Sequence, residues 1–182
     1  MAKVIVHATV SLDGFMADAD GSVDWMNGFP AAPEDEDVVG RVVEKLGAVV
    51  GGANKTQTID DGEVPYGGTL GVPVYLMTHS PHDPIEKNGV TYTFVVDDIA
   101  QAVDAAKKSA GDGLVSLLGG TIARQCLQLG LVDEIHLDVA PILLGDGISL
   151  FAGLGRRVDL ERIHTSAFPA GGEAHLRYRV VR

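Results

Sequence analysis

The chain has 182 residues, of which 46% are hydrophobic and 21% are charged, and its formal net charge is −11. This composition supports a substantial core and a single domain spanning 1–182, and it argues against disorder. The negative charge and the scattered basic residues argue against nucleic-acid binding. No apolar run approaches the roughly 20 residues that cross a bilayer, and no signal peptide is evident, so we expect a cytoplasmic protein that does not bind membranes.

Apolar patterning predicts eight strands and three helices. Strands alternate with helices over the first 140 residues, which is typical of a largely parallel sheet, whereas the last two strands should form a hairpin. We therefore predict an α/β fold with a mixed, mostly parallel sheet flanked by helices and an antiparallel C-terminal hairpin. Ligands should collect at the carboxyl ends of the parallel strands. The strands are expected at 3–10, 47–50, 72–78, 91–96, 114–118, 134–140, 158–167 and 174–181, and the helices at 34–46, 98–110 and 121–129.

The most informative stretch is LVSLLGGTIARQCLQLG, at 114–130. A buried strand is followed by Gly119 and Gly120 and then by a helix whose apolar face carries Ile122, Cys126 and Leu129. A helix start offers unpaired N–H groups and a partial positive charge, so this turn could hold a phosphate. The alternative is a tight turn with no ligand. The three spaced glycines and the later acid of the dinucleotide fingerprint are absent.

A second glycine turn follows the strand predicted at 47–50. Gly51, Gly52, Lys55 and Thr56 could hold another phosphate there, but the spacing does not match a Walker A loop, which excludes a nucleotide triphosphatase. Residues 56–71 combine glycines, a proline and acids, as a long loop that acts as a lid often does.

Asp13 is the best-placed acid, because it follows the first strand directly. Asp before glycine is also a common turn pair, so a purely structural role stays open. Asp18, Asp20 and Asp24 lack the EF-hand pattern and are expected to form a solvated acidic loop.

The remaining reactive side chains give no positive signal for hydrolysis or metal binding. The six histidines show no zinc-binding spacing and are expected to be structural. Cys126, the single cysteine, should pack inside the protein, and no GxSxG elbow is present. Two phosphate-compatible turns, one acid and one lid are typical of an enzyme whose cofactor supplies the chemistry.

Three ordered motifs, SLDGFMA, LLGGTIARQ and LVDEIHLDVAPILLGDGISLF, resemble the RibD C-terminal reductase domain of riboflavin biosynthesis within the dihydrofolate reductase-like superfamily. The resemblance spans nearly the whole chain and implies a reductase that transfers a hydride from NADPH to a carbonyl or imine carbon. The substrate would be small and similar to a pteridine, a flavin precursor or a pyrimidine.

The resemblance also implies roles for individual residues. Asp13 would be catalytic, orienting a hydroxyl or supplying a proton. Ser11, Leu143, Leu144 and Gly145 would form the substrate pocket. The implied NADPH-binding residues are Ala8, Gly51, Gly52, Lys55, Thr56, Thr78, His79, Gly119, Gly120, Thr121, Ile122 and Arg124.

Two departures weaken the implied preference for NADPH over NADH. The second glycine turn reads GGANKT where relatives often have Gly-Arg-x-Thr, and THSPH lacks a following arginine. Lys55, His79 and Arg124 are then the candidate partners of a 2′-phosphate. The single cysteine also excludes the zinc deaminase signature that often accompanies this reductase.

Two other functions and one assembly remain as alternatives. One function is a non-catalytic protein that binds NADPH or a nucleotide. The other is dihydrofolate reductase, although Glu34, Asp35, Glu36 and Asp37 present a charged helix start instead of one defined acid. A homodimer is expected from the apolar strands at 135–140 and 176–181, which could pair or pack across a two-fold axis.

Overall fold

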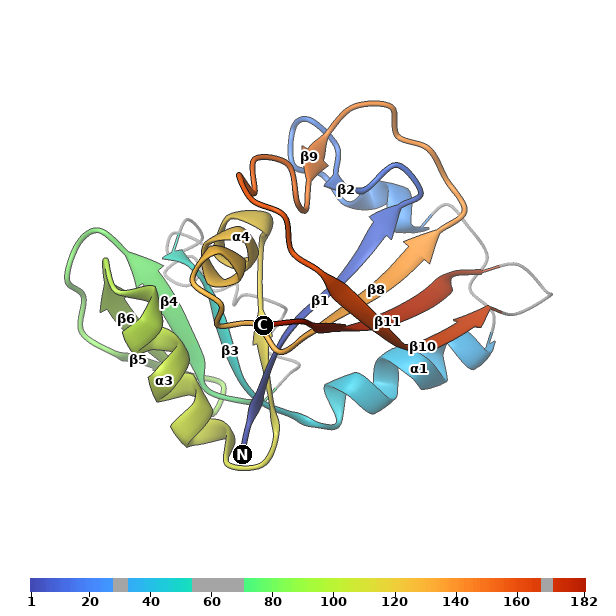
Figure 1. Cartoon of the computed structure of the whole chain (residues 1–182). Helices are drawn as coiled ribbons and strands as arrows, with labels where there is room; N and C mark the ends of the chain where they lie inside the picture. Colours follow the sequence, from blue (N-terminus) through green and yellow to red (C-terminus); the bar gives the residue numbers. More distant parts are fainter. Residues whose placement is uncertain (28–32, 54–70, 168–171) are drawn as a thin grey trace.

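A nine-stranded mixed sheet organises the computed structural model, which describes residues 1–27, 33–53, 71–167 and 172–182, without the side chains of 33–37. Six adjacent strands are parallel, and antiparallel pairing occurs at both ends of the sheet (Figure 1). The strand order is β10 (Leu160–Ala167), β11 (Ala174–Val180), β8 (Glu134–Ala140), β1 (Lys3–Ser11), β7 (Leu114–Leu117), β3 (Leu46–Gly52), β4 (Val74–Thr78), β6 (Val90–Val96) and β5 (Ile85–Lys87).

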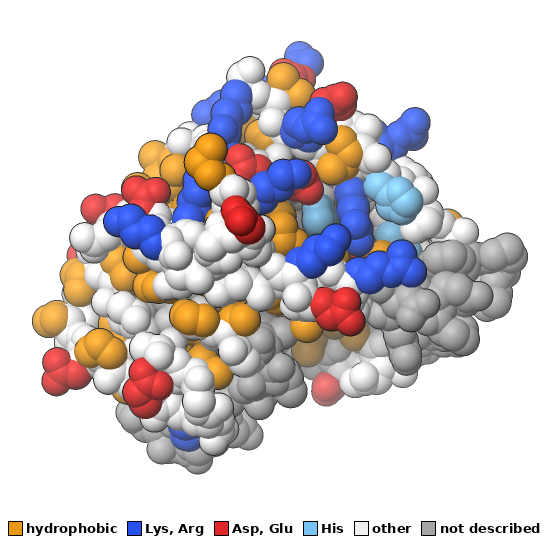
Figure 2. All heavy atoms as spheres, turned by 90° about the horizontal axis from the view of Figure 1, so that it is seen from below, with side chains coloured by type: hydrophobic (Ala, Val, Ile, Leu, Met, Phe, Trp, Pro, Cys, Tyr) orange, Lys and Arg blue, Asp and Glu red, His pale blue; other side chains and the backbone are white. Residues whose placement is uncertain are grey.

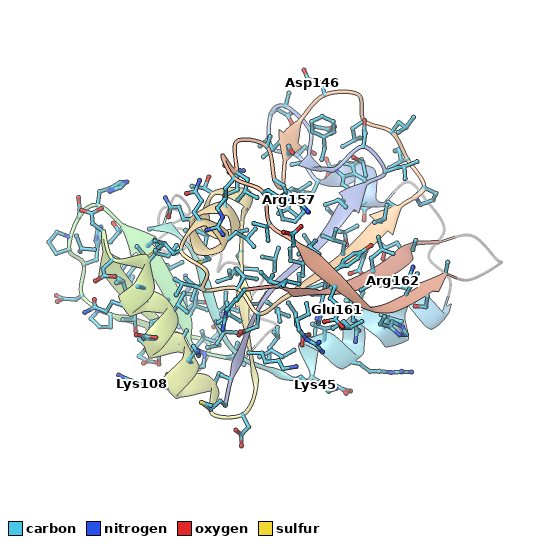
Figure 3. All side chains as sticks on the ribbon, in the orientation of Figure 1. Lys45, Lys108, Asp146, Arg157, Glu161 and Arg162 are labelled. Atoms are coloured by element: carbon cyan, nitrogen blue, oxygen red, sulfur yellow. The ribbon has the colours of Figure 1, made fainter. Side chains whose placement is uncertain are left out.

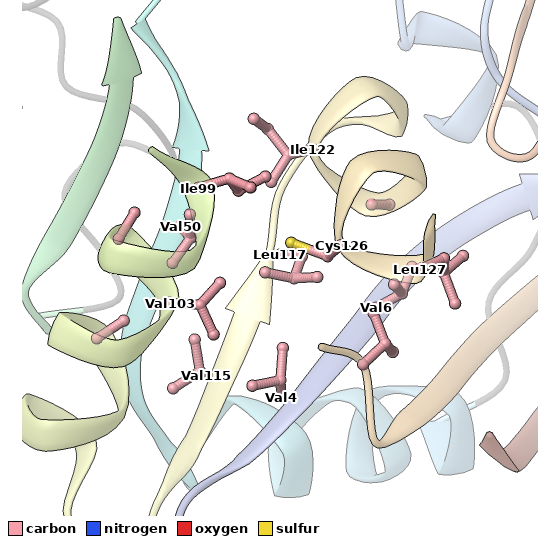
Figure 4. Close-up of a cluster of buried hydrophobic side chains, with 14 of the residues drawn as sticks. Val4, Val6, Val50, Ile99, Val103, Val115, Leu117, Ile122, Cys126 and Leu127 are labelled. Atoms are coloured by element: carbon pink, nitrogen blue, oxygen red, sulfur yellow. The ribbon is translucent and has the colours of Figure 1, made fainter. Parts of the chain in front are cut away.

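Two neighbouring helices, α3 (Ile99–Ala110) and α4 (Gly120–Gln128), pack against this sheet, and α1 (Pro33–Val43) lies away from them, below β8 and β10 in Figure 1. Their apolar faces meet the central strands in one core. Figure 4 shows Val103 of α3 and Cys126 of α4 pointing toward Val115 and Leu117 of β7. Burial raises the pKa of the Cys126 thiol to about 12, so this cysteine is a packing residue, as its position on the apolar helix face predicts.

All eight predicted strands are present, with ends displaced by at most two residues. The sequence did not predict β5, a two-stranded sheet of β2 (Phe15–Ala17) and β9 (Ile148–Ser149), or the 3₁₀ helix η1 (Asp24–Asn27). The three unpredicted strands have two or three residues each, too few to show a repeating pattern. Two helix ends were predicted too far along the chain. Leu129 caps α4 and is 59% exposed, because the helix ends at Gln128. The helix predicted at 34–46 ends at Val43, and Leu46 begins β3.

The apolar strands that we expected across a two-fold axis pair with each other inside the chain. In β8 and β11, Leu137 is in register with Leu176, and the other edges of these strands bind β1 and β10. Neither strand therefore has a free edge for a second copy. The strands at the ends of the described sheet are β10 and β5, and the homodimer itself stays a prediction.

Basic side chains are less scattered than the sequence predicted. Lysine and arginine side chains gather on the face shown in Figure 2. Three ion pairs neutralise part of the basic charge near the C-terminus: Arg157 with Asp159, Arg179 with Glu161, and Arg182 with Asp133.

Several predicted features lie outside the described residues. They are Lys55, Thr56 and nearly all of the loop predicted at 56–71, together with the side chains of Glu34, Asp35, Glu36 and Asp37. Among the helices that the structure describes, none is long and apolar enough to cross a membrane.

The start of α3 provides a test of the helix assignment. The carboxylate of Asp98 accepts a hydrogen bond of 2.9 Å from the Gln101 N–H, as an N-cap should. We expect Asp98→Ala to lower the free energy of unfolding by about 1 kcal/mol in urea denaturation. Asp104→Ala removes an exposed acid from the same helix and should change it by less than about 0.5 kcal/mol. Equal losses in both variants would contradict the capping role.

Candidate functional site

The turn between β7 and α4 leaves the start of α4 open. Gly119 is the N-cap residue, its φ of 87° lies in the region that favours glycine, and it forms no side-chain cap hydrogen bond. The first N–H groups of the helix have no partner within the helix and carry a partial positive charge. This end of α4 can therefore receive an anion, as its sequence predicts.

Gly120 is required for a different reason, which is space. A Cβ atom at this position would lie 3.2 Å from the carbonyl oxygens of both Ser149 and Leu150 and 2.8 Å from Nη1 of Arg124. Such contacts are closer than side chains normally make, so any larger residue would push α4 away from the segment at 149–150. The absence of a side chain fixes where the helix start lies.

The open helix start faces a groove of about 990 Å³ at the carboxyl ends of β3, β4 and β7. The strand order places β7 between β1 and β3. From β3 the chain adds β4 and β6 on one side of β7, and after β7 it adds β8 on the other side, so the order of strands reverses beside this groove. Such switch points are where open α/β sheets bind ligands. A groove of this size also falls at the upper end of ordinary cofactor sites.

The structure brings most of the described cofactor residues together in the groove. The residues predicted from the sequence that line it are Gly51, Gly52, Thr78, His79, Gly119, Gly120, Thr121 and Ile122. Sequence reasoning missed Met16 and Ile148 at the small β2–β9 sheet, and Asp97 directly after β6. Asp97 could have been found, because it follows the carboxyl end of a predicted parallel strand.

Two predicted cofactor residues do not line the groove. The side chain of Ala8 packs against the hydrophobic core. Arg124 donates hydrogen bonds to the carbonyl oxygens of Ser149 and Leu150 and to Oγ1 of Thr121. Its guanidinium therefore ties α4 to the neighbouring segment, and its contact with a 2′-phosphate stays a prediction.

The outer end of the groove carries one close ionisable pair. Nδ1 of His79 lies 2.5 Å from Oδ1 of Asp97, and both side chains are more than half exposed. His82 lines the same region, and its ring centroid lies 5.0 Å from that of Phe94. A 2′-phosphate here would meet an acid as well as two imidazoles, so this end favours NADPH less strongly than an arginine would.

Asp13 connects two segments that are far apart in the sequence. Its carboxylate accepts hydrogen bonds from the Ser11 hydroxyl at 2.6 Å, the Gly145 N–H at 2.8 Å and the Leu144 N–H at 3.2 Å. Ser11 is buried, and its Oγ also accepts a hydrogen bond from the N–H of Phe15. The substrate residues predicted from the sequence therefore meet, and Asp13 holds them together.

These contacts set the protonation state of Asp13. The hydrogen bond from Ser11 is the largest effect and lowers the pKa of this carboxyl below its usual value of 3.8. Desolvation opposes it, and the N–H groups of Gly145 and Leu144 lower the pKa further. Asp13 is therefore ionised at neutral pH. An ionised carboxylate accepts hydrogen bonds and orients groups, but it cannot donate a proton.

Leu143 lies in the same loop but is 67% exposed. Figure 3 shows Asp146 at the outer tip of this loop, pointing away from the sheet. Gly147 turns the chain back toward β2. A Cβ atom added at Gly147 would lie only 2.3 Å from the carbonyl oxygen of Ala17. The loop is thus fixed at both ends, by Asp13 and by the close approach at Gly147.

The fold and the groove define the class of α/β protein to which dihydrofolate reductase belongs. The chain belongs to the family of the RibD C-terminal domain, which it matches over residues 2–172. Membership of this family supports a reductase role.

Individual relatives cover nearly the same length. The uncharacterized protein YyaP of Bacillus subtilis is 27% identical, with 93% of this chain and 90% of YyaP covered. The putative riboflavin biosynthesis protein of Shewanella sp. PV-4 is similar in structure, with a TM-score of 0.77, 24% identity and full coverage of both chains. Dihydrofolate reductase of Enterococcus faecalis, solved with NADP(H), shares the fold with a TM-score of 0.63, 13% identity and coverage of 99% and 97%.

A charge placed at the start of α4 tests the anion site. Thr121 is exposed in the first turn of α4 and lines the groove. Thr121→Asp should fold, because an acid is favourable at this end of a helix, but its carboxylate should repel a bound phosphate. We expect the dissociation constant for NADPH to rise at least about tenfold, or about 1.4 kcal/mol, in a fluorescence titration. Thr121→Asn is the uncharged control, and an equal effect in both variants would exclude the electrostatic explanation.

The carboxylate of Asp13 is tested by amide exchange. Asp13→Asn should increase hydrogen exchange at Leu144 and Gly145, because their acceptor loses its charge. Since the folded pKa of Asp13 is lowered, its stabilising effect is present above pH 3.8 and is lost as the pH falls through the folded value. Exchange in the wild type should therefore lose protection only below pH 3.8, after correction for the intrinsic exchange rate. Unchanged exchange in Asp13→Asn would exclude this role of Asp13.

Proposed function

We propose that the protein is a reductase that binds NADPH in the groove and transfers a hydride to a carbonyl or imine carbon of a small substrate. The observation that carries the proposal is the uncapped start of α4, which opens into a groove at the carboxyl ends of β3, β4 and β7. NADPH supplies the hydride when it is bound. The chain itself supplies binding, orientation and exclusion of water.

The residues of the groove fit the parts of such a cofactor. The N–H groups at Gly120, Thr121 and Ile122 would hold the pyrophosphate, and the glycine at 120 lets the helix start lie against the segment at 149–150. Met16 and Ile148 give the end near β2 and β9 an apolar lining that suits the nicotinamide ring. The adenosine would then lie toward β4 and β6.

The outer end of the groove offers polar groups to that adenosine. Thr78 ends β4, His79 and Ser80 follow it, and Asp97 follows β6. Lys55 is the further basic residue considered for the 2′-phosphate. We propose NADPH as the physiological cofactor. The difference in affinity between NADPH and NADH should be smaller than an arginine contact to the 2′-phosphate would give.

The substrate would lie beside the segment that Asp13 holds. Ser11, Leu144 and Gly145 form the described part of this region, and a planar nitrogen heterocycle such as a pteridine, pyrimidine or flavin precursor is the proposed class. Asp13 is ionised, so we propose that it orients the substrate or a water molecule instead of donating the proton directly. The proton would then come from water.

Binding is tested by titrating the protein with NADPH and, separately, with NADH. Trp25 is the only tryptophan and is buried, so its emission reports on one place in the fold. We expect saturable quenching of Trp25 emission and a rise in nicotinamide emission, with tighter binding of NADPH. No binding of either dinucleotide would contradict the proposal.

Catalysis is tested separately, by oxidation of bound NADPH with a panel of pteridines, aminopyrimidine ribosides and simple imines that includes dihydrofolate. Turnover with a member of this panel would exclude a non-catalytic binding protein. Tight binding without any turnover would favour that second function.

A further inference from the structure

A cluster of polar side chains lies on one face of β1, β8 and β11, outside the residues that line the groove. Asp138 of β8 is in register with Thr9 of β1 and with His175 of β11. Since alternate residues of a strand share a face, His7 of β1 projects to the same side as these partners. Glu173 directly precedes β11, and one of its carboxylate oxygens lies near Asp138 and His175. Three adjacent strands thus bring two imidazoles and two carboxylates together.

The distances within this cluster are short. Oδ1 of Asp138 lies 2.7 Å from Nδ1 of His175, and Oδ2 lies 2.8 Å from Nε2 of His7. One ligand atom each of Asp138, Glu173 and His175 lies within 4.8 Å of the other two. A tetrahedral zinc ion, with bonds of about 2.0–2.2 Å, spaces its ligand atoms roughly 3.4 Å apart. The observed spacing brackets this value, so small side-chain movements would complete the site.

The central members of the cluster are shielded from water. The side chain of His175 is 1% exposed, that of Asp138 is 5% exposed and that of His7 is 16% exposed. A buried carboxylate needs a compensating positive charge, but the hydrogen-bond partners of Asp138 in the described residues are imidazoles, which are cationic only when protonated. Burial alone would raise the pKa of Asp138, but the two histidines outweigh it, and the pKa lies below its usual value.

We propose that Asp138, Glu173 and His175 bind a divalent transition-metal ion, with Zn²⁺ as the best match, and that His7 orients the Asp138 carboxylate. One imidazole with two carboxylates suits Zn²⁺ better than Mg²⁺ or Ca²⁺, which prefer oxygen ligands throughout. A hydrogen bond from His7 to the second carboxylate oxygen is the kind of support that fixes a metal ligand.

The ion would link β8 to β11 and to the residue just before it, and β1 would contribute through the hydrogen bond from His7 to Asp138. Bound Zn²⁺ would replace the hydrogen bond between His175 and Asp138. Binding should therefore release protons and weaken at low pH. The metal site lies apart from the groove, so its role would be to stabilise the fold, independently of the proposed reductase activity. Failure of one proposal therefore leaves the other standing.

Calorimetry with Zn²⁺ tests the site in the full chain, after treatment with a chelator, dialysis and removal of any affinity tag. We expect one Zn²⁺ per chain and a rise in the melting temperature. Asp138→Asn and His175→Gln should abolish binding, and Glu173→Gln, at a less buried position, should weaken it at least about tenfold in a folded protein. His7→Gln should weaken it by about 10–100-fold.

The matched control is His164→Gln, which removes an exposed histidine on β10 and should leave Zn²⁺ affinity unchanged. Absence of Zn²⁺ binding in the wild type would overturn the proposal. An unchanged Zn²⁺ affinity in both folded Glu173→Gln and folded His7→Gln would overturn it as well, because the ion would then lie elsewhere. Tighter binding of Mg²⁺ than of Zn²⁺ would contradict the assigned donor set.

Discussion

The close approach of α4 to the segment at 149–150 determines where the groove can form. The carbonyl oxygens of Ser149 and Leu150 lie where a Cβ atom at Gly120 would meet them at 3.2 Å, and the guanidinium of Arg124 binds the same two oxygens. Gly120 permits this close contact because it has no side chain, and Arg124 donates hydrogen bonds to the two carbonyl oxygens. The open end of α4 is thereby fixed at the carboxyl ends of β3 and β7.

The same contact explains why three motifs separated in the sequence occur together. The segment after β1 binds the loop after β8 through the Asp13 carboxylate, and the N–H of Leu12 donates to the carbonyl of Ile142. The end of that loop then packs behind Gly120. Each motif supports its neighbour, so the apolar end of the groove and the open start of α4 are held by one connected set of contacts.

The strands, helices and order of layers could be predicted because each long element carries its own pattern. In β7 and α4, the apolar period, the glycines and the cap are all local signals. The short strands β2 and β9 carry no such pattern and exist because Asp13 and Gly147 bring their backbones together. The side-chain directions of Ala8 and Arg124 also depend on packing between distant segments, and neither residue lines the groove.

The histidines show most clearly that contacts between distant segments could not be predicted from the sequence. No spacing in the sequence connects His7, Asp138 and His175, because their proximity arises only from the pairing of β1, β8 and β11. Conversely, the open helix start at Gly119 and Gly120 could be predicted, since a strand, a glycine pair and a helix start are contiguous. A site built from contiguous residues can be predicted from the sequence. A site assembled from several strands can be predicted only when the pairing register of those strands is known.

The amide spectrum of isotope-labelled protein during addition of NADPH tests the central claim most directly. If the groove holds the dinucleotide, the largest and saturable shifts should occur at Gly120, Thr121 and Ile122, with smaller ones at Gly51 and Gly52. Shifts confined to other parts of the sheet, or no shift at the start of α4 at saturating NADPH, would contradict the account.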